Sequence, residues 1–83
     1  MASGTVSRNV KKATLSGTTG GAGQRYISVS DFPNVINVVC KTNGYAALLY
    51  APVASDTLWF ILFLNQSLSP AANTDVTYEV YYI

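Results

Sequence analysis

The chain has 83 residues, of which 49% are hydrophobic and only 11% are charged. This length is enough for one small domain with a two-layer core, but a monomeric surface normally carries more charge to remain soluble and unassociated. The sequence has no histidine, which excludes an imidazole base, a Ser-His-Asp triad and the common zinc sites. Cys40 is the single cysteine, so an intrachain disulfide is excluded, and its apolar neighbours predict a buried structural thiol.

The first 24 residues are small and polar, and we expect them to form a flexible N-terminal arm or connecting segment. Within them, Val10 to Thr19 can form a weak strand, and the glycine-rich segment 17–23 predicts a turn or hinge. Residues 25–83 are expected to form the folded domain. The start of the chain lacks the apolar core of a signal peptide, which predicts synthesis in the cytoplasm without signal-directed export.

Residues 1–25 contain four cations and no acid, namely Arg8, Lys11, Lys12 and Arg25. Two interpretations are open: a solvated arm that keeps the chain soluble, or an arm that docks on an acidic partner. Nucleic acid is not an expected partner, because the cations are widely spaced and no aromatic residues are interleaved with them.

A strand is expected over residues 25–30, followed by a turn at Asp31-Phe32-Pro33-Asn34. Asn43-Gly44 lies between two apolar runs, 35–42 and 45–50, which predicts a hairpin with a two-residue type I′ turn. This register places Cys40 opposite Ala47 and Val38 opposite Leu49, and with Ile36 these residues would form a core face. The other face would be a partly buried subunit surface, comprising Val35, Asn37, Val39, Lys41, Ala46, Leu48 and Tyr50.

Seven apolar residues follow one another without a break at Leu58–Leu64. In a strand, Trp59, Ile61 and Phe63 would point to one side, and Leu58, Phe60, Leu62 and Leu64 to the other. The run is much shorter than the ~20 residues of a membrane-spanning helix, so we expect no membrane insertion. A thin sandwich covers only one of the two sides, which predicts a homo-oligomer. The expected interface consists of Phe60, Leu62, Leu64, Leu48 and Tyr50.

A longer loop is expected over residues 65–73, and the last strand over Thr74–Ile83. Val76, Tyr78, Val80 and Tyr82 alternate there with polar residues, as in a half-buried strand that ties the end of the chain into a sheet. About six strands at short spacing predict an all-β fold, a compact antiparallel, jelly-roll-like β-sandwich.

The tryptophan strand Leu58-Trp59-Phe60-Ile61, the loop 69–74 and the terminal strand 75–83 resemble small β-sandwich modules of bacteriophages. Such modules lie near the tips of tail fibres and other virion appendages, usually as trimers, and some bind the host surface; head fibres and capsid decoration proteins are similar. The resemblance implies a virion structural protein that forms a homotrimer. Residues 1–24 would then connect it to other virion proteins.

No catalytic site is expected, and neither is a cofactor or a metal. Asp31 and Asp56 fall in predicted turns, where Asp is common, and Asp75 and Glu79 lie on the polar face of the last strand. Paired carboxylates for glycoside hydrolysis, or clustered oxygen ligands for calcium, are not indicated.

Five aromatic side chains could stack on a sugar ring, namely Trp59, Tyr45, Tyr50, Tyr26 and Tyr81. We expect Trp59 to fill the core or a subunit contact. Tyr45 and Asn43, at the expected turn, are the candidate ligand contacts, although Tyr45 could simply pack against Thr42. Two functions are therefore open: a virion assembly module, or a module that binds carbohydrate, such as a host-surface glycan, or another receptor.

Overall fold

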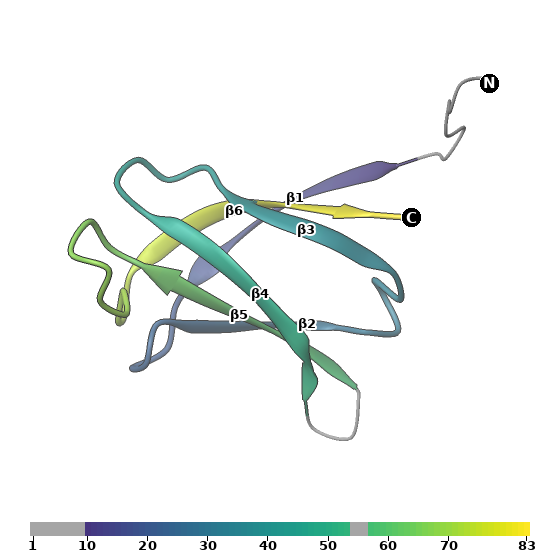
Figure 1. The fold of residues 1–83 in the computed structure, drawn as a ribbon, viewed down its shortest axis with the longest axis horizontal. Helices are drawn as coiled ribbons and strands as arrows, with labels where there is room; N and C mark the ends of the chain where they lie inside the picture. Colours follow the sequence, from purple (N-terminus) through teal and green to yellow (C-terminus); the bar gives the residue numbers. More distant parts are fainter. Residues whose placement is uncertain (1–9, 54–56) are drawn as a thin grey trace.

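The computed structural model describes residues 10–53 and 57–83, and in this part of the chain the fold is all-β (Figure 1). It contains no helix that is long and apolar enough to cross a membrane. Six strands form two three-stranded antiparallel sheets. The strands are β1 (Lys11–Thr18), β2 (Gln24–Ser28), β3 (Val35–Cys40), β4 (Ala46–Val53), β5 (Leu58–Leu64) and β6 (Asp75–Tyr82).

The two sheets pack face to face and have the strand orders β1-β6-β3 and β2-β5-β4. Every connection except that from β4 to β5 crosses from one sheet to the other. The central strands are therefore β5 and β6, the two strands with the clearest apolar patterns in the sequence. The end of the chain is tied into the structure, because the Ile83 N–H donates to the carbonyl of Asn34 at 3.0 Å.

The core lies between the inner sides of β5 and β6. Ile61 and Phe63 of β5 are fully buried, and so are Tyr78 and Val80 of β6. The rings of Phe63 and Tyr78 meet edge to face, with their centroids 5.2 Å apart. The predicted alternation in both strands is thus confirmed, and both obey the two-residue period of a strand with one buried face.

The predicted hairpin at Asn43-Gly44 is wrong. β3 and β4 belong to different sheets, so Val38 pairs with Val80 of β6 and Leu49 pairs with Ile61 of β5. Residues 42–45 still form a turn, in which the Tyr45 N–H donates to the Thr42 carbonyl at 3.3 Å. Only Gly44 has a positive φ there, 85°, whereas a type I′ turn needs one at both central residues. Each strand pairs instead with the central strand of its own sheet, and the turn becomes a corner between the two sheets.

A β-bulge changes which residues of β3 face the core. Val35 pairs with Tyr82 and Asn37 pairs with Tyr81, so Ile36 is the extra residue. Ile36 is 50% exposed, whereas Val35 packs against the core. The sequence predicted the opposite, because strict alternation back from Val38 places Ile36 inside, and a bulge shifts that alternation by one residue.

Part of the segment assigned to the N-terminal arm is built into the sandwich. The strand expected over Val10–Thr19 is confirmed as β1, which pairs with β6 along its whole length. Residues 1–9 lie outside the described residues, and with them Arg8.

The glycine-rich segment after β1 forms a tight turn held against the 70–74 loop. Thr19 is 2% exposed; its hydroxyl donates to the carbonyl of Ala71 and accepts from the Thr74 N–H at 2.9 Å. Gly23 has a φ of 77°, and its carbonyl accepts from the Phe63 N–H at 2.8 Å. The turn therefore joins β1 and β2 to the end of β5.

Trp59 has a structural position, as expected. It packs against the core, and its indole N–H donates to the Phe32 carbonyl at 2.6 Å. The Phe32 ring in turn meets Tyr82 edge to face at a centroid distance of 5.0 Å. Trp59 therefore fixes the 31–34 turn against both sheets.

We predict that Gly23→Ala destabilises the fold by about 2–4 kcal/mol, from the positive φ and from overpacking. A Cβ at this position would lie 2.8 Å from both the Ala71 nitrogen and the Phe63 oxygen, which are backbone atoms. Gly21→Ala is the matched control, because nothing lies within 4 Å of its Cβ position. Urea denaturation measures both variants, and equal stabilities would contradict this account of the turn.

Candidate functional site

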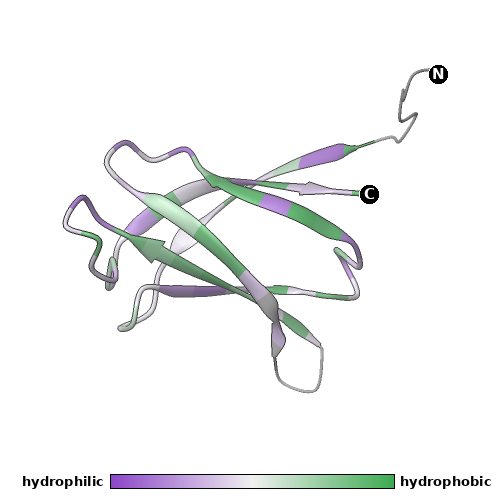
Figure 2. Ribbon diagram, viewed as in Figure 1, coloured by the Kyte–Doolittle hydropathy of each residue, from purple (hydrophilic) through white to green (hydrophobic). Residues whose placement is uncertain are grey.

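The outer side of the β2-β5-β4 sheet carries large apolar side chains in contact with one another. Phe60 of β5 lies between Tyr26 of β2 and Tyr50 of β4, with ring centroids 5.6 and 5.1 Å apart. Beside them Leu62 pairs with Leu48. Figure 2 shows the hydrophobic residues along β4 and β5. We name this surface the apolar face; it consists of Tyr26, Leu48, Tyr50, Phe60, Leu62 and Leu64.

The apolar face is open to solvent in the single chain. Tyr26, Leu48 and Tyr50 are 46%, 43% and 45% exposed. The strand register also places Gln24, Ser28, Ala46 and Leu58 on this side, and none of these positions carries a charge. The five residues predicted as an oligomer interface thus lie together on one surface. Tyr26 was missed there, because the sequence alone did not show that β2 would pair with β5.

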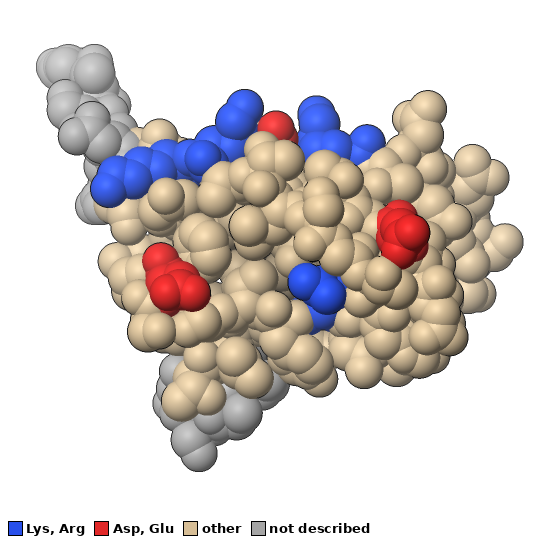
Figure 3. Space-filling view, turned by 180° about the vertical axis from the view of Figure 1, so that it is seen from behind, with Lys and Arg blue, Asp and Glu red and all other residues tan. Residues whose placement is uncertain are grey.

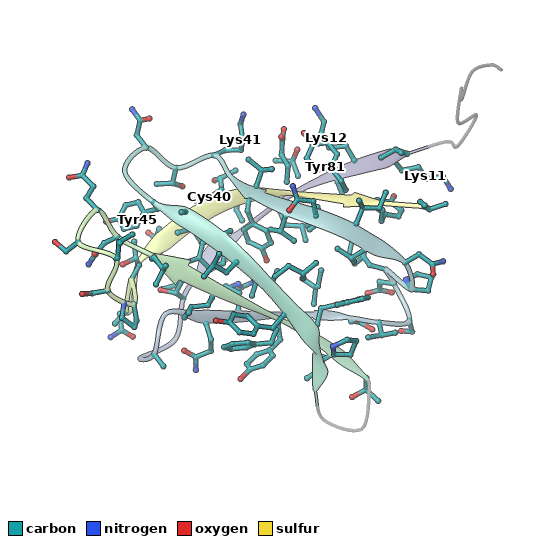
Figure 4. The ribbon with its side chains drawn as sticks, viewed as in Figure 1. Lys11, Lys12, Cys40, Lys41, Tyr45 and Tyr81 are labelled. Atoms are coloured by element: carbon teal, nitrogen blue, oxygen red, sulfur yellow. The ribbon has the colours of Figure 1, made fainter. Side chains whose placement is uncertain are left out.

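The outer side of the β1-β6-β3 sheet is mainly polar, with Val39 of β3 as an exposed apolar residue beside Glu79. Glu79 lies near its middle and accepts a hydrogen bond from the Tyr81 hydroxyl at 3.0 Å. It also pairs with the ammonium groups of Lys12 at 3.4 Å and Lys41 at 4.0 Å. Figure 4 shows Lys12, Lys41 and Tyr81 on this side, and Figure 3 shows charged side chains gathered along one border of the molecule. We name this surface the polar face.

Further hydrogen bonds complete the polar face between β1 and β6. Ser16 and Thr77 share a hydrogen bond of 3.1 Å, and the Thr18 hydroxyl donates to the Asp75 carboxylate at 2.6 Å. These groups satisfy one another and remain in contact with water. The polar face therefore has no need of a covering layer, in contrast to the apolar face.

The hydrogen bond from Tyr81 lowers the pKa of Glu79 below its ordinary value of 4.5, and the nearby Lys12 and Lys41 lower it further. The same hydrogen bond raises the pKa of Tyr81, because it favours the protonated phenol. Both shifts are local effects of a network that holds β1, β6 and β3 together. They do not create a group that titrates near neutral pH.

A second surface feature is a groove at one end of the sandwich. It has a volume of about 370 Å³ and is lined by Asn43, Gly44, Tyr45, Asn65, Gln66 and Ser67. We name it the end groove. It lies between the corner turn after β3 and the loop after β5, at the end away from the start of β1 and from the C-terminus (Figure 1).

The end groove brings the two predicted ligand contacts, Asn43 and Tyr45, together with residues that the sequence did not single out. Tyr45 is half-buried and packs against the core, so only part of its ring faces outward. Asn65, Gln66 and Ser67 come from a loop that the sequence identified only as polar. These three residues reach the groove because the chain crosses from one sheet to the other after β5. A local sequence pattern does not predict such a crossing.

In the part of the chain that the structure describes, Cys40 and the carboxylates of Asp31, Asp75 and Glu79 are not gathered into one site. The described part of the chain contains no group of three or more His, Cys, Asp or Glu that could hold a metal ion. Cys40 is partly buried, and its thiol lies 3.8 Å from the Thr42 carbonyl. Asp31 and Asp75 are exposed on different parts of the fold, and Asp56 lies outside the described residues.

Arg25 closes one open side of the sandwich. Its guanidinium crosses from β2 to β1, donates to the Thr18 carbonyl at 3.2 Å and lies where a Cβ of Gly17 would be. Glycine at position 17 thus leaves room for this cation. Arg25 therefore serves the packing of the fold and is not part of a basic arm.

Models of known protein families, curated proteins and solved structures were compared with the chain, and none matches it. Function must therefore be inferred from the apolar face and the end groove.

We predict that acid destabilises the protein partly through Glu79. Because the pKa of Glu79 is lowered in the folded state, the unfolded chain takes up the proton first, and stability falls as pH drops below about 4.5 towards the folded pKa. Glu79→Gln should therefore show a smaller loss of stability over this range. Asp31→Asn, which changes an exposed acid in a turn, should retain the wild-type loss. Thermal melts at a series of pH values measure this, and identical profiles for wild type and Glu79→Gln would contradict the role of the network.

Proposed function

We propose that the chain is a structural module that assembles with copies of itself through the apolar face. The observation that carries this proposal is the contrast between the two outer sides of one small sandwich. One side satisfies its charges and hydroxyls internally, and the other exposes a continuous cluster of tyrosine, phenylalanine and leucine side chains.

Burial of the apolar face would supply a driving force for association. Burying apolar area contributes about 25 cal/mol per Å², so several large side chains withdrawn from water supply several kcal/mol per subunit. Loss of free translation and rotation on association costs about 4–15 kcal/mol, which an interface must exceed. A face without charge adds little desolvation cost to this sum. Closed cyclic symmetry would bury the same face in every copy.

We further propose that the assembly is a trimer and that it belongs to a bacteriophage virion, as a fibre, tip or capsid-decoration module of jelly-roll-like type. The support is the resemblance of the tryptophan strand and the terminal strand to such modules. These two segments are β5 and β6, the central strands of the two sheets. Under this proposal, the segment before β1 joins the module to other virion proteins. The work of the module is assembly, and neither catalysis nor a cofactor is part of the proposal.

Binding of a carbohydrate or another receptor on the same scaffold is a second candidate function. The observation that favours it is the end groove, which forms around the two residues expected to contact a ligand, Asn43 and Tyr45. The groove and the apolar face share no residue, so both functions could operate in one molecule.

We predict that Leu48→Lys converts the oligomer into a monomer, since it places a charge within the apolar face, next to Leu62 of the central strand. Val39→Lys is the matched control. Val39 is 38% exposed on β3, an edge strand of the other sheet, and lies opposite Glu79 on the polar face. Light scattering should give three times the 8.9 kDa chain mass for wild type and Val39→Lys, and a single chain mass for Leu48→Lys.

A monomeric wild-type chain at micromolar concentration would contradict self-assembly. A stable dimer would contradict the trimer while leaving the apolar face as the interface. Loss of the oligomer in both lysine variants would show that the interface is not confined to the apolar face.

A further inference from the structure

We propose that the end groove is a binding site for a neutral saccharide. This inference rests on the second candidate function and narrows it to one class of ligand, but it does not depend on self-assembly. It rests on three features of the groove: the chemistry of its lining, the fixed position of its walls and its place in the fold.

The lining is polar and carries no formal charge at neutral pH. Asn43, Asn65 and Gln66 contribute carboxamides, Ser67 contributes a hydroxyl, and Tyr45 contributes a phenol. The carboxamides of Asn43 and Gln66 can both donate and accept hydrogen bonds, as sugar hydroxyls do. Asn65 offers its amide N–H groups, because its side-chain oxygen already accepts from two backbone N–H groups. An anionic ligand would instead call for arginine or lysine at the site, as bidentate or charge-assisted partners. The lining therefore favours an uncharged ligand rich in hydroxyl groups.

Tyr45 adds an apolar surface to this polar lining. Its side chain packs against the core on one side and lines the groove on the other. An aromatic ring held in this way can receive the C–H face of a sugar ring. Because the core already restricts the ring, little side-chain entropy is lost when a ligand binds.

The wall formed by the corner turn is fixed to the polar sheet. The Lys41 N–H donates to the Thr77 carbonyl at 2.8 Å, and the Thr77 N–H donates to the Thr42 hydroxyl at 2.9 Å. Both bonds anchor the turn to β6 immediately before Asn43. The position of Asn43 and Tyr45 is thus set before any ligand arrives.

The opposite wall, the loop after β5, is held in shape by the side chain of its first residue, Asn65. The Asn65 side-chain oxygen accepts from the N–H groups of Ser67 at 2.9 Å and Ser69 at 3.1 Å. The two walls lie close together: a Cβ added at Gly44 would be 3.2 Å from the side-chain nitrogen of Gln66. A groove of about 370 Å³ between two braced loops lies within the range of about 300–1,000 Å³ that is common for small-ligand sites.

The place of the groove leaves it accessible in an assembly. It lies at the end of the sandwich away from the start of β1 and the C-terminus, where Lys11 pairs with Tyr82. It also shares no residue with the apolar face. A chain held by either of its ends, or by its apolar face, would still present this groove.

The test is an NMR titration of the intact 15N-labelled chain with neutral and charged sugars. The neutral probes are lactose, maltotriose, mannotriose and tri-N-acetylchitotriose, and the charged probes are sialyllactose and a heparin hexasaccharide. We expect saturable shifts with at least one neutral probe, confined to the backbone amides of residues 43–45 and 65–67. The charged heparin probe should give none at these residues.

Variants assign the site. Asn43→Ala and Gln66→Ala change exposed side chains and should each weaken binding of the same probe about tenfold, which corresponds to about 1.4 kcal/mol. Tyr45→Phe keeps the ring and should retain most of the affinity, whereas Tyr45→Ala should abolish binding. Ser16→Ala changes an exposed hydroxyl on the polar face and should have no effect.

Absence of saturable shifts with all neutral probes, at millimolar concentrations, would overturn the proposal. Saturable shifts at other residues, or unchanged affinity in both Asn43→Ala and Gln66→Ala, would overturn it as well. Leu48→Lys separates this result from self-assembly: it should bind the probe as wild type does, even if the chain proves monomeric.

Discussion

The structure depends on one constraint, the two-sided apolar character of β5. A strand sends alternate side chains to opposite sides, so an unbroken apolar run must be covered on both. Ile61 and Phe63 are covered by β6 and the rest of the core. Phe60 and Leu62 remain on the outer side, where β2 and β4 add further apolar groups beside them. A sandwich of two layers supplies a single core, so the second apolar side stays exposed in the single chain, and the proposed self-assembly would cover it.

β6 differs from β5 on its outer side, which is polar. It is also a central strand with a fully buried inner side, but its outer side carries Asp75, Thr77, Glu79 and Tyr81. Glu79 pairs with Lys12 of β1, with Lys41 immediately after β3 and with the Tyr81 hydroxyl of its own strand, which makes a water-exposed polar network. The two central strands therefore give the domain one face suited to water and one suited to a partner. Such an asymmetry is typical of modules that assemble, since large exposed apolar patches are uncommon on monomers.

The sequence predicted those parts of the fold that follow from alternation along single strands. The inner and outer sides of β5 and β6 and the structural place of Trp59 depend only on the two-residue period. The pairing of strands was not predictable in this way. Asn43-Gly44 is a strong local hairpin signal, but each flanking strand pairs with the central strand of a different sheet. The bulge at Ile36 likewise arises in the pairing of β3 with β6, and the sequence of β3 did not predict it.

The same distinction applies to the candidate sites. The apolar face was predictable because most of it comes from β5 and its direct neighbour β4. The end groove was predictable only for Asn43 and Tyr45, since its other wall is brought there by the crossing of the chain from β5 to β6. The central claim is that copies of the chain cover the apolar face. Hydroxyl-radical footprinting of the wild-type chain at high and low concentration tests it most directly. The account predicts that Tyr26 and Tyr50 are protected at high concentration and become reactive on dilution, while Tyr81 does not change. Equal reactivity of Tyr26 and Tyr50 at all concentrations would contradict it.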